Sequence, residues 1–223
     1  MGGSSLLSLL VLAAIAVFLI LRLRSVLGTR EGFEKPRVVR PEDESPANRN
    51  RRGFEVIEGG PDHDITENVE AGSRAAENLA AMKRIEPDFS VSDFIGGARG
   101  AYEMILMAFE GGDLEEVKSF LSEDVYDAFK SVVDARVEQG LEVDADFIGL
   151  SEIQIIDADL DRADNEAEIK VRFVSELSFV VRDPTGQIVE GNPNAIKRQK
   201  DIWTFARTLG ADDPNWILVA TGA

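Results

Sequence analysis

The sequence predicts an α+β protein with a single N-terminal transmembrane helix, a disordered charged linker and a folded C-terminal domain. Residues 1–21 carry no charged side chain, and the region after Gly28 is rich in charged residues, Pro and Gly. Helical patterns begin near Phe89, and after Gly140 the apolar period changes from 3.6 to 2. We therefore expect helices packed on one face of a curved antiparallel sheet.

Residues 1–27 are predicted to form a membrane anchor. The segment from Leu6 to Leu21 is apolar apart from Ser8, and roughly 20 such residues span the hydrocarbon core of a bilayer. A cleaved signal peptide would carry basic residues before its apolar run, whereas here they follow it. By the positive-inside rule, the N-terminus lies outside and the C-terminal domain lies in the cytoplasm. The candidate contacts with anionic lipid or a partner after this run are Arg22, Arg24 and Arg30.

Residues 28–86 are predicted to be a disordered linker, because few of their side chains could bury an apolar face. Within this stretch, Ser73 to Arg84 is a candidate short helix, although its apolar surface is small. The folded domain is then expected to span residues 87–223.

Three helices are predicted at the start of this domain. The first begins at Ser90 with a capping pattern, places Phe94, Ala98, Ala101, Ile105 and Phe109 near one face, and ends at Gly111-Gly112. Glycines at 96, 97 and 100 weaken it, so we expect close packing against a neighbour to offset their cost. The second helix starts at Asp113 with a capping box to Glu116, and the third runs from Ser122 to Gln139.

The strands follow as an antiparallel meander. Ala167 to Val181 alternates apolar with charged or polar residues, which is typical of a strand with one buried face. A shorter strand is predicted from Leu150 to Ala158, and turns at residues 161–165 and 183–186. Ile188-Val189 follows the second turn, and further strands are predicted from Ile202 to Leu209 and from Trp216 to Ala220.

Charge is distributed unevenly along the chain. The formal net charge is -17, and residues 87–223 contribute -16 of it, with 12 basic and 28 acidic residues. A domain this acidic lacks the basic footprint that phosphate binding needs, which argues against nucleic acid as a partner. Its one basic cluster, a further candidate contact with lipid or a partner, comprises Lys197, Arg198 and Lys200.

No catalytic residue, metal site or cofactor is predicted. The chain has no Cys, and its single His, His63, lies in the predicted linker without neighbours at ligand spacing. Acidic residues around Asp157 to Asp161 lack the Gly and closing Glu of a calcium loop.

Five segments in order resemble a known family. They are GDLEEVKSFLSEDVYDAF, IKVRFVSEL, DPTGQIVEG, DIWTFAR and NWIL. They are similar to the C-terminal domain of the mitochondrial inner-membrane translocase subunit forty-four, and the membrane-anchored layout is similar to bacterial relatives, the TimA-type adaptors. The resemblance covers Pro87 to Ala223.

The resemblance implies a cystatin-like or nuclear-transport-factor-two-like sheet, an apolar pocket and a non-enzymatic role. We expect a membrane-anchored adaptor at the bacterial inner membrane, with the lipid bilayer and membrane proteins or translocation and assembly factors as partners. The alternatives are a small-ligand binding protein or enzyme that uses the pocket, and a recruiter of an Hsp70-type chaperone. The candidate pocket residues are Tyr102, Ile105, Phe109, Phe173, Trp203, Phe205 and Trp216.

Overall fold

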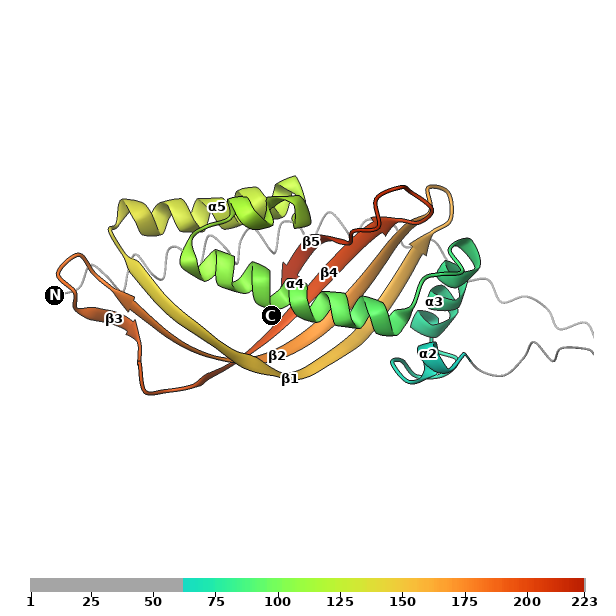
Figure 1. The fold of residues 1–223 in the computed structure, drawn as a ribbon, viewed down its shortest axis with the longest axis horizontal. Coiled ribbons are helices and arrows are strands. Elements are labelled where there is room, and N and C mark those ends of the chain that lie inside the picture. The colour runs from blue at the N-terminus through green and yellow to red at the C-terminus, as the bar shows by residue number, and fades with distance from the viewer. Residues whose placement is uncertain (1–61, 223) are drawn as a thin grey trace, which may run out of the picture. The chain divides into compact units, whose positions relative to one another are not determined.

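The computed structural model describes residues 62–222, which form helices packed on one antiparallel sheet (Figure 1). This arrangement confirms the predicted α+β class. The helical elements are α2 (His63–Thr66), α3 (Arg74–Ile85), α4 (Val91–Gly111), the 3-10 helix η1 (Glu115–Phe120) and α5 (Glu123–Glu138). The strands are β1 (Glu142–Asp161), β2 (Glu166–Arg182), β3 (Ile188–Gly191), β4 (Lys197–Thr208) and β5 (Ile217–Gly222).

The five strands form one sheet in the order β1-β2-β4-β5, and β3 pairs with the distal end of β2. All pairings are antiparallel, so the predicted meander is confirmed. β1 and β2 are longer than the other strands and curve along the sheet in Figure 1. β1 begins at Glu142 rather than at the predicted Leu150, because its first half alternates small or half-buried apolar residues with acidic ones.

Three register shifts in β1 account for its bending. They lie between Phe147 and Gly149, between Leu150 and Glu152, and between Ile155 and Asp157. A bulge adds a residue to one strand of a pair, and this bends the strand and increases its local twist. The sheet therefore curves toward the face on which α4 lies, which we call the inner face.

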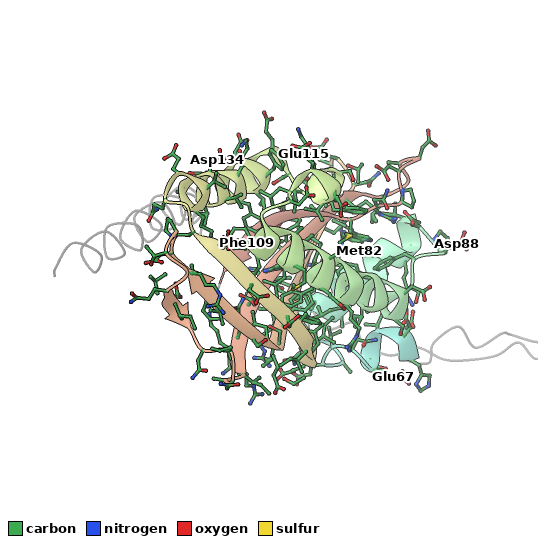
Figure 2. The ribbon with its side chains drawn as sticks, turned by 60° about the vertical axis from the view of Figure 1, so that its left-hand side comes forward. Glu67, Met82, Asp88, Phe109, Glu115 and Asp134 are labelled. Carbon is green, nitrogen blue, oxygen red and sulfur yellow. The ribbon has the colours of Figure 1, made fainter. Side chains whose placement is uncertain are left out.

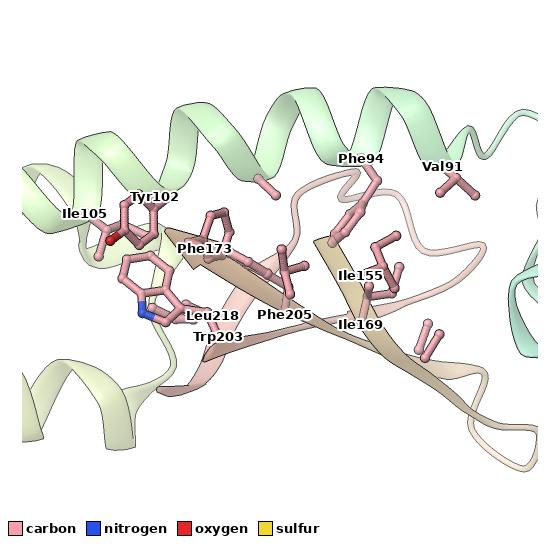
Figure 3. Packing of buried hydrophobic residues seen from close by; sticks show 14 of the residues in the cluster. Val91, Phe94, Tyr102, Ile105, Ile155, Ile169, Phe173, Trp203, Phe205 and Leu218 are labelled. Atoms are coloured by element: carbon pink, nitrogen blue, oxygen red, sulfur yellow. The ribbon is translucent and has the colours of Figure 1, made fainter. Parts of the chain in front are cut away.

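The core lies between α4 and the inner face (Figure 3). α4 contributes Phe94 and Ile105, and the odd-numbered residues of β2 from Ala167 to Phe173 are buried opposite them. The predicted inner stripes of the first long helix and of the long strand are thus confirmed. Ala101 and Phe109 lie at the margin of the core and are only partly buried.

The glycines of α4 do not have the predicted role. Gly96, Gly97 and Gly100 are exposed, and a Cβ added at any of them would meet no neighbouring atom within 4 Å. The expectation that close packing offsets their cost is therefore wrong, because these positions face away from the sheet.

Serine side chains cap the three longer helices. Ser73, Ser90 and Ser122 accept backbone N–H bonds from Ala76, Asp93 and Val125, respectively. The predicted capping box at Asp113 is wrong, because η1 begins only at Glu115 and has no side-chain cap.

Part of the predicted linker belongs to the folded domain. Residues 62–86 form α2 and α3, and α3 buries Leu79 and Met82 completely in the core. The prediction of disorder is wrong for this part, because Leu79 and Met82 bury their side chains in the core where α3 packs against β1. The remainder of the predicted linker and the predicted anchor of residues 1–27 lie outside the described residues. No helix within residues 62–222 is long and apolar enough to cross a membrane.

Candidate partner-binding site

The seven predicted pocket residues lie in the core or at its margin. Tyr102, Ile105, Phe173, Trp203 and Phe205 are almost completely buried, while Phe109 and Trp216 are partly buried. Their rings pack on one another, with the Tyr102 and Phe173 ring centroids 4.4 Å apart and those of Tyr102 and Trp203 4.7 Å apart. Trp216 packs edge-on against Phe94 at 4.9 Å.

The predicted apolar pocket is therefore a packed core. Figure 3 shows the Tyr102, Phe173 and Trp203 side chains gathered between α4 and the strands. Two concavities at the surface of residues 62–222, described below, include none of the seven residues. The reason for the correction is that α4 inserts its own bulky side chains into the concave side of the sheet.

The Tyr102 hydroxyl is the polar group at the centre of this core. It donates to Asp201 Oδ2 at 2.6 Å and lies 2.8 Å from Ser175 Oγ, while Gln199 Nε2 donates to the same Asp201 oxygen at 2.9 Å. Burial, together with the Asp201 carboxylate, raises the pKa of Tyr102 well above its usual range. The hydroxyl is thus protonated and hydrogen-bonded, which describes a core residue with a satisfied polar tip.

The structure separates the predicted basic cluster into two sets. Lys197 lies opposite Leu177 on the inner side of the sheet, and its Nζ is 4.5 Å from the Phe179 ring centroid. Arg198 and Lys200 point to the outer face, which is the side opposite α4, because side chains alternate along a strand. Arg22, Arg24 and Arg30 lie outside the described residues.

A groove lies where α4 and α5 end and β1 begins. It has a volume of about 390 Å³. Its lining combines apolar and charged side chains from Glu110, Gly111, Gly112, Val133, Arg136, Val137, Leu141, Glu142 and Val143. Val137 is 70% exposed, so its side chain is accessible along the wall of the groove. We call this feature the α4–α5 groove.

A half-buried ion pair forms the polar part of the groove. Arg136 Nη2 lies 3.3 Å from Glu110 Oε2, and its other nitrogen, Nη1, donates to the Phe109 carbonyl at 3.2 Å. The Arg136 guanidinium also lies over the Phe109 ring at 4.7 Å. Burial raises the pKa of the Glu110 carboxyl above its usual value, and the charges of Arg136 and Lys197 only partly oppose this effect.

Sequence reasoning missed this groove. Glu110 and Arg136 come from different helices, and no local motif joins them. The one signal present was Val137, an apolar residue outside the inner stripe of its helix.

A second concavity follows the exposed side of α5. It is lined by Asp127, Lys130, Ser131, Asp134, Ala135 and Glu138 and measures about 440 Å³. Across residues 62–222, no three His, Asp or Glu side chains are grouped so as to hold a metal ion.

A family model described as the Tim44-like domain matches residues 75–223. The chain belongs to the Tim44-like domain family. The match begins inside α3, in agreement with the burial of that helix in the core. The resemblance of the sequence segments to this family is therefore confirmed.

Curated relatives are translocase subunits with low identity to this chain. It is 24% identical over 161 residues to the mitochondrial import inner membrane translocase subunit TIM44-1 of Arabidopsis thaliana, which covers 70% of this chain and 34% of the relative. It is 22% identical over 133 residues to subunit TIM44 of Homo sapiens, covering 59% of this chain and 29% of the relative. The chain thus spans about a third of the length of these relatives.

Among solved structures, the intermembrane space region of the chloroplast protein ARC6 is similar at 14% identity and a TM-score of 0.39. The similarity covers 57% of this chain and 94% of that chain. At this TM-score the likeness supports no conclusion about the present chain.

Proposed function

We propose that this protein is a membrane-anchored adaptor that binds membrane proteins, or their translocation and assembly factors, through its Tim44-like domain. The observation that carries the proposal is the position of two features at opposite ends of α4. Residues 62–66, where the chain enters the domain, are bonded to the first turn of α4, and the α4–α5 groove lies at its last turn. With 21 residues, α4 holds the two features about 30 Å apart.

The predicted anchor completes this arrangement. The apolar run of residues 1–27 and the basic residues behind it support a single-pass protein of the bacterial inner membrane, with the N-terminus outside and the domain in the cytoplasm.

The groove fits a protein segment better than a small molecule. It is open and has an apolar wall around Val137 and Leu141 beside the Glu110–Arg136 ion pair, whereas small-molecule sites are enclosed and mostly apolar. A partner that inserts an apolar side chain next to a polar contact matches this lining. The packed core around Tyr102 favours a non-enzymatic role.

Affinity capture of the tagged full chain after mild detergent extraction tests the proposal. The groove variant is Val137→Glu, which places a charge on the apolar wall at a site exposed enough to tolerate it. The matched control is Ile148→Glu, at a position that is 51% exposed and outside the groove.

We expect the wild type and I148E to recover the same membrane-protein or translocation-factor partner, and V137E to lose at least about 90% of it, because a buried unpaired charge opposes binding. An Hsp70-type chaperone as the main captured protein would identify the partner class as a chaperone. Equal recovery by V137E and wild type would exclude the groove, and recovery of no partner from normally expressing cells would contradict the adaptor function.

A further inference from the structure

A stripe of four cations runs along the outer face of the sheet. Residues 170 and 172 of β2 point outward, because the odd-numbered neighbours Ile169, Val171 and Phe173 are buried in the core. In the register of β2 and β4, Lys200 lies opposite Val174 and Arg198 lies opposite Glu176. We call the resulting set the cationic stripe, and its members are Lys170, Arg172, Lys200 and Arg198.

The register determines the spacing of this stripe. Its four members lie at, or opposite, positions 170, 172, 174 and 176 of β2, which all point outward. Neighbouring members are therefore about 6.6 Å apart along the strand direction, and the stripe is about 20 Å long. The stripe crosses from β2 to β4 at its middle. Acidic neighbours on the same face include Glu152, Glu168 and Glu176, and also Asp157 and Asp159, which lie opposite Lys170 and Glu168. Asp157 and Asp159 pair with Arg74 of α3.

Most of these cations have no ionic partner within the domain. Arg172 pairs with Glu152 at 2.5 Å, but Lys170, Arg198 and Lys200 make no ion pair within residues 62–222. Residues 87–223 hold 28 acidic and 12 basic residues. Three outward cations without an ion pair among the described residues are therefore available to an anionic surface.

The chain carries a matching anionic surface on α5. Asp124, Asp127, Asp134 and Glu138 are exposed and repeat at intervals of three, seven and four residues, with Ser131 filling the central gap. This spacing places them on one side of the helix, over about 21 Å. Asp134 pairs with Lys130 at 2.8 Å, and the other three make no ion pair in the described part of the chain. We call the four residues Asp124, Asp127, Asp134 and Glu138 the anionic stripe.

Figure 2 shows α5 at the margin of the molecule, with the Asp134 side chain projecting outward. The anionic stripe and the cationic stripe therefore have the same length and opposite charge, and their side chains are exposed, apart from Arg172, which is partly exposed. They lie on α5 and on the opposite, outer face of the sheet, so one copy cannot join its own two stripes.

We propose that the outer face of the sheet binds α5 of a second copy of this chain, with the cationic stripe of one copy along the anionic stripe of the next. The proposal is independent of the adaptor function. Each copy presents both stripes, so the contact is heterologous and extends into a row of copies instead of closing as a two-fold dimer. At about 0.15 M salt the Debye length is about 8 Å. Repulsion between the acidic side chains that lie outside the two stripes is therefore largely screened, whereas the stripes themselves are in contact.

Charge reversal on the full chain in a non-ionic detergent tests this contact by sedimentation velocity at physiological salt. The first variant combines Arg198→Glu with Lys200→Glu, and the second combines Asp127→Lys with Asp134→Lys. The matched control is Arg99→Glu with Arg162→Glu, which has the charge change of the first variant at exposed positions outside both stripes. Concentrations up to about 100 µM detect the weak affinities expected of a polar surface contact.

We expect the wild type and the control to self-associate, and each stripe variant to weaken self-association at least about tenfold. An equimolar mixture of the two stripe variants should regain association, because each then meets a stripe of opposite charge. A wild type that stays monomeric, a mixture that does not associate, or a control as weak as the stripe variants would overturn the proposal. So would unchanged self-association of R198E/K200E with reduced co-sedimentation on anionic vesicles, which would assign the cationic stripe to a membrane surface.

Discussion

Asp64 caps α4 from a distant part of the sequence. The backbone N–H groups of Val91 and Ser92 each donate to an Asp64 carboxylate oxygen at 2.8 Å. Lys83 Nζ lies 2.7 Å from the same carboxylate and thereby ties α3 to it. The segment through which the chain enters the domain is thus bonded to the positive end of the helix dipole of α4.

Removal of this cap should destabilise the domain. We expect Asp64→Ala to lower the free energy of unfolding by about 1–3 kcal/mol, because it leaves helix N–H groups and Lys83 without their partner. Urea unfolding measures the change. The comparison variant is Asp88→Ala, an exposed acidic residue without a hydrogen bond in the described residues, which should change stability by no more than about 0.5 kcal/mol. Equal effects of the two variants would show that Asp64 acts only through its charge.

The same carboxylate predicts a pH dependence. Burial tends to raise the pKa of Asp64, but bonds from Lys83, Ser92 and the backbone outweigh it and hold the pKa well below 3.8. Because the folded-state pKa is depressed, the stability contributed by Asp64 is present above the unfolded-state value of 3.8 and is lost as the pH falls through the folded-state value. Urea unfolding of wild type and Asp64→Asn should therefore differ by a constant amount above about pH 5 and converge in acid. A difference that grows in acid would contradict this assignment.

Tyr102→Phe removes only the hydroxyl from the core. The ring packing against Phe173 stays, but Ser175 and Asp201 lose a hydrogen-bond partner. We expect a loss of about 1–2 kcal/mol in the free energy of unfolding. Tyr126→Phe is the control, since its hydroxyl bonds Glu115 at the surface, and it should cost less. Partner capture should remain at the wild-type level in Y102F, and a selective loss of the partner in a stable Y102F would indicate a functional role for this hydroxyl.

Two glycine substitutions in or after α4 should change the free energy of unfolding in opposite directions. Gly97→Ala is expected to raise the free energy of unfolding by up to about 1 kcal/mol, because the site is helical, exposed and open to a Cβ. Gly112→Ala should lower it by about 1–2 kcal/mol, since Gly112 ends α4 with φ of 79° and its Cβ would lie 3.4 Å from Val133. Thermal unfolding of both variants gives the comparison. A destabilised G97A would show that the exposed side of α4 has a contact outside the described residues.

Local patterns in the sequence predict the elements that bury one continuous stripe. α4 has a serine cap, apolar residues every three to four positions and a glycine stop, and β2 has strict alternation, so both were predicted nearly to their ends. α3 was underestimated because its apolar surface is small, and its burial depends on β1, about 80 residues away in the sequence. Asn78 Nδ2 donates to the Ala158 carbonyl at 2.8 Å across this distance.

The site was harder to predict than the fold. The aromatic residues can be recognised from the sequence, but the sequence does not show how much space remains once α4 lies on the sheet. The pocket that the resemblance implies is therefore filled by side chains in this structure. Among the basic residues of the sheet, Lys197, Arg198 and Lys200 are close together in sequence. Their separation onto two faces, and the alignment of Arg198 and Lys200 with Lys170, depend on the pairing of β2 with β4.

The irregular path of β1 also has a consequence for solubility. β1 is an edge strand, and an edge that presents a straight row of unpaired N–H and C=O groups is a template for uncontrolled strand pairing between molecules. Its three bulges interrupt that row, and α3 occupies part of it through Asn78. The sheet is thereby protected against aggregation through edge-to-edge strand pairing. In the proposed row of copies, the contacts are then made by side chains.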